Sequence, residues 1–332
     1  MKLKPLDRQV IVITGASSGI GLVTARRAAA KGARVMLVAR SGDALGEAVR
    51  EINNAGGQAD FHIADVAEAA QIDTAAQATV ARFGRIDSWV NDAGVVIYAK
   101  LIETPEDEHR RLFDVNYWGV VHGCQAAVRH MKADGGALVT VGSIGSDLPT
   151  PLMSAYAASK HAVKGYVESL RIELNGDGIP ITVSLVKPSG IDTPIAQHAI
   201  NHEGGEAQVP PLIYAPELVA DAILDCCVTG RREVTVGGSG KAQTLFAQHF
   251  KGLYDKMAPW GEAAMINKDG TQPPTNMWDA GVNAGRERSG EHRPLEHSVY
   301  TAAAKRPGLT MAVAGGVLAG AVGLLFARRR RD

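Results

Sequence analysis

Three side chains in the middle of the chain have the residue types needed to move a proton: Ser143, Tyr156 and Lys160. Because Tyr156 and Lys160 are four positions apart, a helix would place them on one face. Reduction of a ketone needs a proton donor beside the developing alkoxide, and oxidation of an alcohol needs a base. An ammonium one helical turn away favours the phenolate of a tyrosine, whose ordinary pKa is about 10. Ser143 would hold the substrate oxygen by a hydrogen bond, although a Tyr-x-x-x-Lys spacing alone is a common coincidence.

A glycine-rich turn near the N-terminus predicts a dinucleotide site. It follows an expected strand and leads into an expected helix that begins near Leu22. Glycines let the backbone approach a pyrophosphate, and the helix N-terminus supplies free N–H groups and partial positive charge. The spacing is G-x-x-x-G-x-G and differs from the general G-x-G-x-x-G fingerprint. The residues expected to contact the cofactor here are Gly15, Ser17, Ser18, Gly19, Ile20 and Gly21. An oxidised nicotinamide bound nearby would further favour the Tyr156 phenolate.

The end of the second expected strand indicates which dinucleotide is used. An NAD-preferring domain carries an acidic residue near this point to bind the ribose 2′-hydroxyl. Here Ala39 takes that place and Arg40 follows it. A guanidinium binds a 2′-phosphate through charge-assisted hydrogen bonds, so NADP(H) is favoured over NAD(H). The alternative for Arg40 is an ordinary solvated charge.

These residues need a scaffold, and the hydrophobic pattern predicts one. Short apolar runs bounded by Gly, Asp or Pro alternate with longer Ala-rich helical stretches, which indicates βαβ units. The expected fold is α/β, a doubly wound parallel sheet of about seven strands in a three-layer α/β/α arrangement. The expected strands are Val10–Thr14, Arg34–Ala39, Ala59–Ile63, Ser88–Asn91, Ala137–Val141, Thr182–Lys187 and Glu233–Val236.

In this order, the motifs resemble those of the short-chain dehydrogenase/reductase family, which has a Rossmann-type sheet. The resemblance covers roughly residues 6–240. It rests on the glycine turn, the Asp65-Val66 pair, Asn91-Asp-Ala-Gly94, Asn116, Ser143 with Tyr156 and Lys160, and Pro188-Ser-Gly-Ile-Asp-Thr193. Two positions depart from the usual family pattern. Asp92 stands in Asn-Asn-Ala-Gly and Ser189 stands in Pro-Gly, and neither change removes an expected chemical group.

The resemblance implies a role for each matching residue. Tyr156 would be the acid/base, Ser143 would orient the carbonyl, and Lys160 would bind the nicotinamide ribose and lower the tyrosine pKa. Asn116 would kink its helix and hold a water that links Lys160 to solvent. The implied cofactor contacts also include Asp65 and Val66 at the adenine, Asn91, Ala93 and Gly94 on the adenosine side, and Pro188, Ile191 and Thr193 at the nicotinamide. Family members commonly form homodimers or homotetramers.

Composition excludes several other classes of protein. Among 332 residues the formal net charge is zero, so no broad basic surface indicates a nucleic-acid partner. The three cysteines match neither a zinc site nor a disulfide framework. The histidines have no ligand spacing, so no metal site is expected. The N-terminus has no apolar run typical of a signal peptide.

The C-terminal part lies beyond the resemblance. We expect a catalytic domain over 1–258 and a flexible tether over 259–307. One more amphipathic helix is expected over 241–259, at the end of the catalytic domain. Residues 308–327 carry no charge and are long enough to span a bilayer, and 328–332 form a basic tail. This predicts a membrane-anchored protein whose catalytic domain faces the cytoplasm. The alternative is a soluble cytoplasmic protein with an Ala/Gly helix that packs on a partner.

The function expected from these features is NADP(H)-dependent interconversion of a carbonyl and an alcohol. The substrate loop should lie between Thr193 and Pro216, and its apolar residues hint at a lipophilic small molecule. The loop residues expected to form that lining are Ile195, Ala196, Ile200, Val209, Leu212 and Ile213. The alternatives are an NAD-linked alcohol dehydrogenase of the same family and a membrane-tethered NADPH-binding scaffold without turnover.

Overall fold

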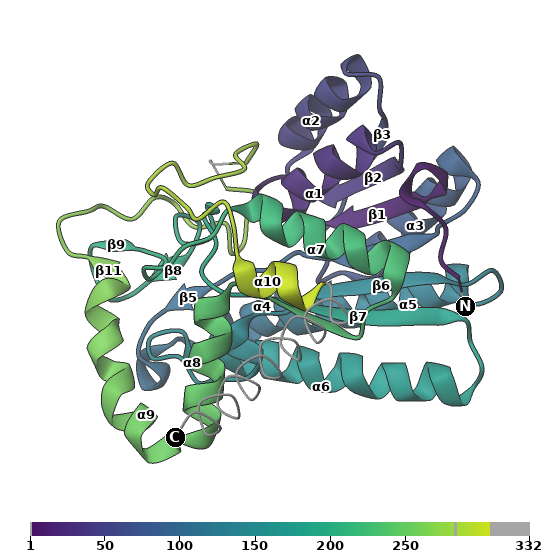
Figure 1. The fold of residues 1–332 in the computed structure, drawn as a ribbon. Helices are drawn as coiled ribbons and strands as arrows, with labels where there is room; N and C mark the ends of the chain where they lie inside the picture. Colours follow the sequence, from purple (N-terminus) through teal and green to yellow (C-terminus); the bar gives the residue numbers. More distant parts are fainter. Residues whose placement is uncertain (1, 282–283, 306–332) are drawn as a thin grey trace, which may run out of the picture.

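The computed structural model describes residues 2–281 and 284–305, and its centre is a sheet of seven parallel strands (Figure 1). In spatial order the strands are β10 (Glu233–Val236), β7 (Ile181–Pro188), β6 (Gly136–Val141), β4 (Ser88–Asn91), β1 (Val10–Thr14), β2 (Arg34–Ala39) and β3 (Gln58–Ile63). The seven expected strands are confirmed. Three of them gain a residue at their start, and β7 also gains one at its end.

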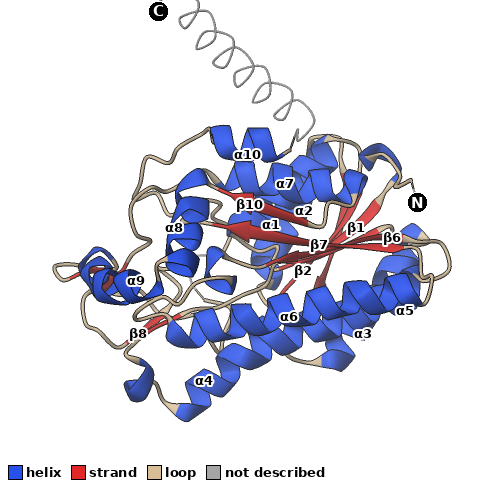
Figure 2. Ribbon diagram, turned by 60° about the horizontal axis from the view of Figure 1, so that its bottom comes forward, coloured by secondary structure: helices blue, strands red, loops and turns tan. Residues whose placement is uncertain are grey.

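The sheet is covered on both faces, because successive side chains of each strand point alternately into two hydrophobic cores. In β1, Val10 and Val12 belong to one buried cluster, and Ile11 and Ile13 belong to the other. On the first side lie α3 (Ala69–Phe83), α5 (Gly119–Met131) and α6 (Ser154–Gly176). On the second side lie α1 (Gly19–Ala30), α2 (Gly42–Asn54) and α7 (Pro216–Thr229). The three layers are visible in Figure 2 and confirm the expected architecture.

The strand order reverses between β1 and β4, and this reversal fixes where a ligand can bind. The chain proceeds outward from β1 to β2 and β3 on one side, and from β4 to β6, β7 and β10 on the other. In such sheets the crevice opens outside the carboxyl ends of the strands at the reversal. The glycine turn after β1 and the segment after β4 therefore lie on either side of it.

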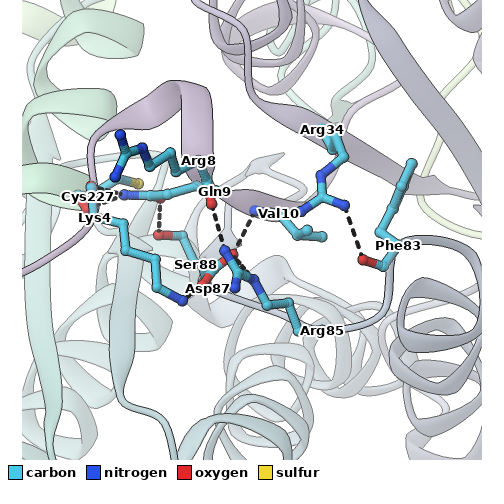
Figure 3. Close-up of polar contacts among 10 residues, drawn as sticks. All are labelled: Lys4, Arg8, Gln9, Val10, Arg34, Phe83, Arg85, Asp87, Ser88 and Cys227. Carbon is cyan, nitrogen blue, oxygen red and sulfur yellow. Dashed lines mark hydrogen bonds and ion pairs between the residues drawn. The ribbon is translucent and has the colours of Figure 1, made fainter.

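At the end of the sheet opposite the crevice, a buried acid holds the strands together. Asp87, which is 5% exposed, precedes β4 and accepts a hydrogen bond from the backbone N–H of Val10 at 2.8 Å. Its carboxylate also contacts Lys4 at 2.6 Å and Arg85 at 2.9 Å (Figure 3). These contacts fix the start of β1 against β4, so that the strands end together at the crevice.

Helices and short strands complete the wall of the crevice. A helix α4 (Glu106–Phe113) runs through a π-helical turn, η3 (Asp114–Trp118), into α5. The prediction of one continuous helix over 241–259 is wrong. The structure has two helices, α8 (Gly238–His249) and α9 (Lys251–Met257), separated at Phe250, which has φ −123° and ψ 49°. The remaining short elements are β5 (Ile97–Tyr98), β8 (Ile200–Asn201), β9 (Glu206–Ala207), β11 (Ile266–Asn267), η1 (Leu6–Arg8), η2 (Leu101–Glu103), η4 (Ile144–Ser146) and η5 (Ala258–Ala264).

The described part of residues 259–305 lies against the catalytic domain and ends in α10 (Val299–Ala304), which differs from the expected flexible tether (Figure 1). Leu295 pairs with Ile213 through its N–H at 2.8 Å, and Thr301 accepts from the N–H of Gly237 at 3.0 Å. Hydrogen bonds from main-chain and side-chain groups hold this segment. Such contacts need no periodic apolar pattern in the sequence, so the composition resembled that of a linker.

The expected membrane span at 308–327 and basic tail at 328–332 lie outside the described residues. Within residues 2–281 and 284–305, the helices are all too short or too polar to cross a bilayer.

Candidate active site

The glycine turn packs so tightly that side chains are excluded from it. Gly15 has φ +71°, and a Cβ there would lie 2.7 Å from the backbone nitrogen of Ala93. A Cβ on Gly21 would lie 2.4 Å from the carbonyl oxygen of Gly15. The turn therefore presents main chain to the crevice, which is the surface that a pyrophosphate requires. Gly21 itself is covered and does not line the cavity.

The three expected catalytic side chains come together at the carboxyl end of β6. Ser143 follows β6 and caps the short helix η4, where its hydroxyl accepts from Gly145 N–H at 3.0 Å. Tyr156 and Lys160 lie in the first two turns of α6. The Lys160 Nζ atom is 5.6 Å from the centre of the Tyr156 ring and donates to the Val141 carbonyl at 3.0 Å. All three expected residues line one cavity together with the glycine turn.

Burial controls the protonation of this group. It raises the pKa of Tyr156 to about 12, although the hydrogen bond with Ser143 acts in the lowering direction and the charge of Asp92 raises it further. Burial also lowers the pKa of Lys160 to about 8, opposed by Asp92. The expected lowering of the tyrosine pKa is therefore not produced by the protein groups alone, since desolvation outweighs them. The phenol is a proton donor at neutral pH.

Asp92 is a member of the site that the sequence marked only as a departure from the family pattern. Burial raises its pKa to about 7, opposed by the nearby Lys160 ammonium and by a hydrogen bond from the backbone of Gly21. The side chain thus interacts both with the glycine turn and with the Lys160 ammonium. An acid at a position where the family pattern has an amide was the available signal for its role.

Asn116 lies in the π-helical turn between α4 and α5. Its side-chain oxygen accepts from Val95 N–H at 2.8 Å, and its amide donates to the Val95 carbonyl at 3.0 Å and to Ser159 at 3.1 Å. π-turns of this kind are frequent at functional sites. Asn116 thereby fixes the segment after β4 against α6, without lining the cavity itself.

The residues after β4 divide between the cavity and the core. Ala93 and Gly94 line the cavity, and a Cβ on Gly94 would lie 3.4 Å from the Asn116 oxygen. Asn91 is 3% exposed and turns away from the cavity, because its oxygen accepts from the Trp89 indole at 2.8 Å and its amide faces Cys124 at 3.4 Å. Asn91 therefore acts on the site by packing β4.

At the end of the cavity where the adenosine is expected, Arg40 already forms hydrogen bonds with main-chain oxygens. Its guanidinium donates to the carbonyls of Asn276, Met277 and Trp278, the latter two at 3.2 and 3.1 Å. Met277 is fully buried in the core on the α5 side of the sheet, which anchors this segment. Burial lowers the pKa of Arg40. The sequence did not indicate that the C-terminal segment reaches the cofactor cavity.

Asp65 and Val66 also line this end of the cavity. The Asp65 carboxylate pairs with Arg111 at 2.5 Å, and Arg111 in turn donates to the Met277 carbonyl at 3.1 Å and lies 5.6 Å from the Trp278 ring centre. The Asp65 side chain is therefore held in a fixed position at the cavity wall.

At the other end, the segment after β7 faces the glycine turn. Pro188, Ile191 and Thr193 line the cavity as expected, and a Cβ on Gly19 would lie 3.3 Å from the Thr193 side chain. Ser189, the second departure from the family pattern, donates to the Val236 carbonyl at 2.9 Å. The two walls of the crevice thus meet beside Gly19.

The cavity has a volume of about 750 Å³ and continues past Tyr156 into an apolar chamber. Of the expected loop residues, Ile195, Val209 and Leu212 line it, whereas Ala196, Ile200 and Ile213 do not. The sequence did not predict the contributions of other elements to this chamber. The lining residues missed are Val96, Tyr98, Ile144, Met153, Phe246, Tyr254, Met257 and Met265.

His198 lies in the wall beside the crevice and is 7% exposed. Burial, assisted by the charge of Arg286, lowers its pKa to about 4. The imidazole is therefore neutral at physiological pH. Across the described ranges, three or more His, Cys, Asp or Glu side chains do not gather in a metal-binding arrangement.

Comparison with known proteins agrees with this geometry. The family model described as short chain dehydrogenase matches residues 9–204. An uncharacterized oxidoreductase of Bacillus subtilis (strain 168), YxnA, is 38% identical over 328 residues, which cover 96% of this chain and 91% of that protein. 11-beta-hydroxysteroid dehydrogenase A of Sesamum indicum is 34% identical over 238 residues, 68% of each chain.

A solved structure shows the same fold. It is a short-chain dehydrogenase/reductase from Burkholderia phymatum in complex with NAD, with a TM-score of 0.69 and 26% identity over 76% of this chain and 96% of that chain. The motif order, the parallel sheet and the family match agree. The chain is an oxidoreductase that belongs to the short-chain dehydrogenase/reductase family.

Proposed function

We propose that this protein is an NADP(H)-dependent oxidoreductase that interconverts a carbonyl and a primary or secondary alcohol on a lipophilic substrate. The observation that carries the proposal is the shared cavity. Ser143, Tyr156 and Lys160 line the same space as the glycine turn on one side and an apolar chamber on the other. Tyr156 thus lies between the place for a dinucleotide and the place for an apolar molecule.

The residues of the chain fit a bound nicotinamide dinucleotide, because Gly15 and Gly19 leave main chain facing the cavity where a Cβ would intrude. When bound, the nicotinamide supplies or accepts the hydride. Ser143 holds the substrate oxygen, and Tyr156 donates its proton to that oxygen as the carbonyl is reduced. Lys160 binds the ribose and contributes positive charge beside the phenol, and the amide of Asn116 holds the segment that positions both.

Apolar residues dominate the far side of the cavity and support a lipophilic substrate. Burying apolar surface of a ligand contributes roughly 25 cal/mol per Å². The Sesamum indicum relative is named as a hydroxysteroid dehydrogenase, and a steroid is a substrate of this character. The proposal extends to a long-chain or polycyclic alcohol or carbonyl. It includes membrane anchoring through 308–327 with the catalytic domain on the cytoplasmic side, and assembly as a homodimer or homotetramer.

The preference for NADP(H) rests on Arg40 and on the absence of an acid at Ala39. We expect Arg40→Ala to raise the KM for NADPH about tenfold or more, because a charge-assisted hydrogen bond to the 2′-phosphate is lost. The KM for NADH should change little, and steady-state kinetics with both cofactors measure the difference. An equal rise in the KM for both cofactors would instead show that Arg40 only holds the carbonyls of 276–278.

The proposed reaction is tested with a panel of aldehydes and ketones, mixed with the purified protein and NADPH while nicotinamide absorbance is followed. Oxidation of NADPH that is greatest with apolar ketones and disappears in Tyr156→Phe is the expected result. Activity confined to small polar sugars would contradict the substrate class. NADPH binding without turnover on any member of the panel would favour the scaffold alternative.

A further inference from the structure

Residues 284–291, here called the clasp, contact the glycine turn directly. The N–H of Gly285 donates to the Ser17 carbonyl at 2.7 Å, and the N–H of Gly19 donates to the Arg286 carbonyl at 2.9 Å. Gly19 is the first residue of α1, so one of the free donors at that helix N-terminus is bound by the clasp. The clasp thus binds the same turn that would receive the pyrophosphate.

The clasp is also joined to the segment after β7. Asp192, which is 1% exposed, accepts hydrogen bonds from the Ser289 hydroxyl at 2.5 Å and from the Ser289 N–H at 3.2 Å. The Gln197 side chain donates to the Ser289 carbonyl at 3.3 Å and also bonds Glu291. Asp192 lies between Ile191 and Thr193, two of the residues that line the nicotinamide end of the cavity.

Ion pairs hold the clasp to the helices behind the crevice. Glu287 pairs with Arg26 of α1 at 2.6 Å, and Arg288 pairs with Glu217 of α7 at 2.9 Å. Each pair is partly exposed, so solvent screens its charges and its contribution to stability is small. The buried Ser289–Asp192 bonds are therefore the stronger attachment.

We propose that the clasp belongs to the dinucleotide site and limits the exchange of the cofactor. The inference rests on the proposed use of a nicotinamide dinucleotide. The glycine turn and Thr193 lie close together beside Gly19, and the clasp forms hydrogen bonds with both walls, at Ser17 and Gly19 on one side and at Asp192 on the other. A dinucleotide lying between these walls leaves only after they separate, and separation breaks the bonds to Ser289. Ser289 is thus a positioning residue for the cofactor.

The test measures how fast NADPH leaves the full-length protein, by stopped-flow fluorescence after mixing with excess NADP⁺. We expect Ser289→Ala to raise the dissociation rate about tenfold, because hydrogen bonds to a buried carboxylate are lost. Ser298→Ala is the matched control, since Ser298 is also buried but caps α10 away from the crevice. Its dissociation rate should equal that of the unaltered protein. Unchanged rates in Ser289→Ala, or equal increases in both variants, would overturn the clasp.

A second pair of variants avoids the buried core. Arg26 pairs with Glu287 of the clasp and with Glu51 of α2. Glu287→Ala should raise the dissociation rate by about two- to threefold, and Glu51→Ala should leave it unchanged. Equal effects of the two substitutions would overturn the clasp even if Ser289→Ala fails to fold. If the unaltered protein binds neither NADPH nor NADH, the proposed function fails. If the protein binds NADPH but the substitutions leave its dissociation rate unchanged, only the proposed role of the clasp is overturned.

Discussion

Tyr156→Phe is expected to lower kcat for carbonyl reduction by about 10²–10⁴-fold, because it removes the hydroxyl that protonates the substrate oxygen. The ring remains in place, so the cavity keeps its shape and the dissociation constant of NADPH should change by less than about twofold. Steady-state turnover together with fluorescence titration of NADPH measures both quantities. The substitution thus separates the chemical step from binding.

Tyr166→Phe is the matched control for this experiment. Tyr166 lies on the same helix α6, contacts the ring of Tyr117 with centroids 6.1 Å apart, and does not line the cavity. Its kcat should stay within about twofold of the unaltered protein. Full activity in Tyr156→Phe, or an equal loss in Tyr166→Phe, would remove Tyr156 from its role as acid.

The direction of catalysis follows from the same phenol. With a pKa raised to about 12 by burial, Tyr156 holds its proton at neutral pH and is ready to donate it to an alkoxide. Alcohol oxidation requires the opposite state and needs further positive charge near the hydroxyl. Lys160, whose own pKa is lowered to about 8, is still predominantly protonated at pH 7 and supplies part of that charge. We therefore expect alcohol oxidation to increase toward alkaline pH more than carbonyl reduction does.

The sheet and its catalytic side chains could be predicted because local patterns specify them. A strand buried on both faces, such as β1, is a continuous apolar run, and its end fixes the position of the glycine turn. Tyr156 and Lys160 are four residues apart on one helix, so their relative position does not depend on how the rest of the chain folds. Ser143 lies two residues after the end of β6. Once the order of the strands is known, these residues are expected to lie close together.

The parts that escaped prediction depend on contacts between distant segments. The carbonyls that bind Arg40 belong to residues 276–278, and main-chain oxygens leave no trace in residue types. The clasp likewise uses the backbone of Gly285 and Arg286, and Gly285 has φ +94°, which breaks any helical or strand periodicity. The same composition that suggests a linker is therefore also the composition of a segment held by turns.

Asp92→Asn is expected to stabilise the protein most at pH 8, less at pH 5, and little below the unfolded pKa of 3.8. In the folded chain the pKa of Asp92 is raised from 3.8 to about 7, because burial disfavours the carboxylate. The stability linked to this group is fully present below the unfolded pKa and is lost as the pH rises through about 7. Asparagine keeps the shape without titrating. At about 1.4 kcal/mol per pH unit the shift corresponds to about 4 kcal/mol, an upper limit that solvent screening in the cavity reduces.

Urea unfolding at pH 5 and pH 8 measures this effect, with Asp87→Asn as the contrasting control. Asp87 is a buried acid that pairs with Lys4 and Arg85 at the end of the sheet opposite the crevice (Figure 3). Its replacement should lower the free energy of unfolding, since two ion pairs lose their acid. The charge of Asp92 also raises the pKa of Tyr156 and of Lys160. Asp92→Asn should therefore move the pH profile of alcohol oxidation toward lower pH. The free energy of unfolding could instead fall by the same amount between pH 5 and pH 8 in Asp92→Asn and in the unaltered protein. In that case Asp92 is not the titrating group, and another residue links the glycine turn to Lys160.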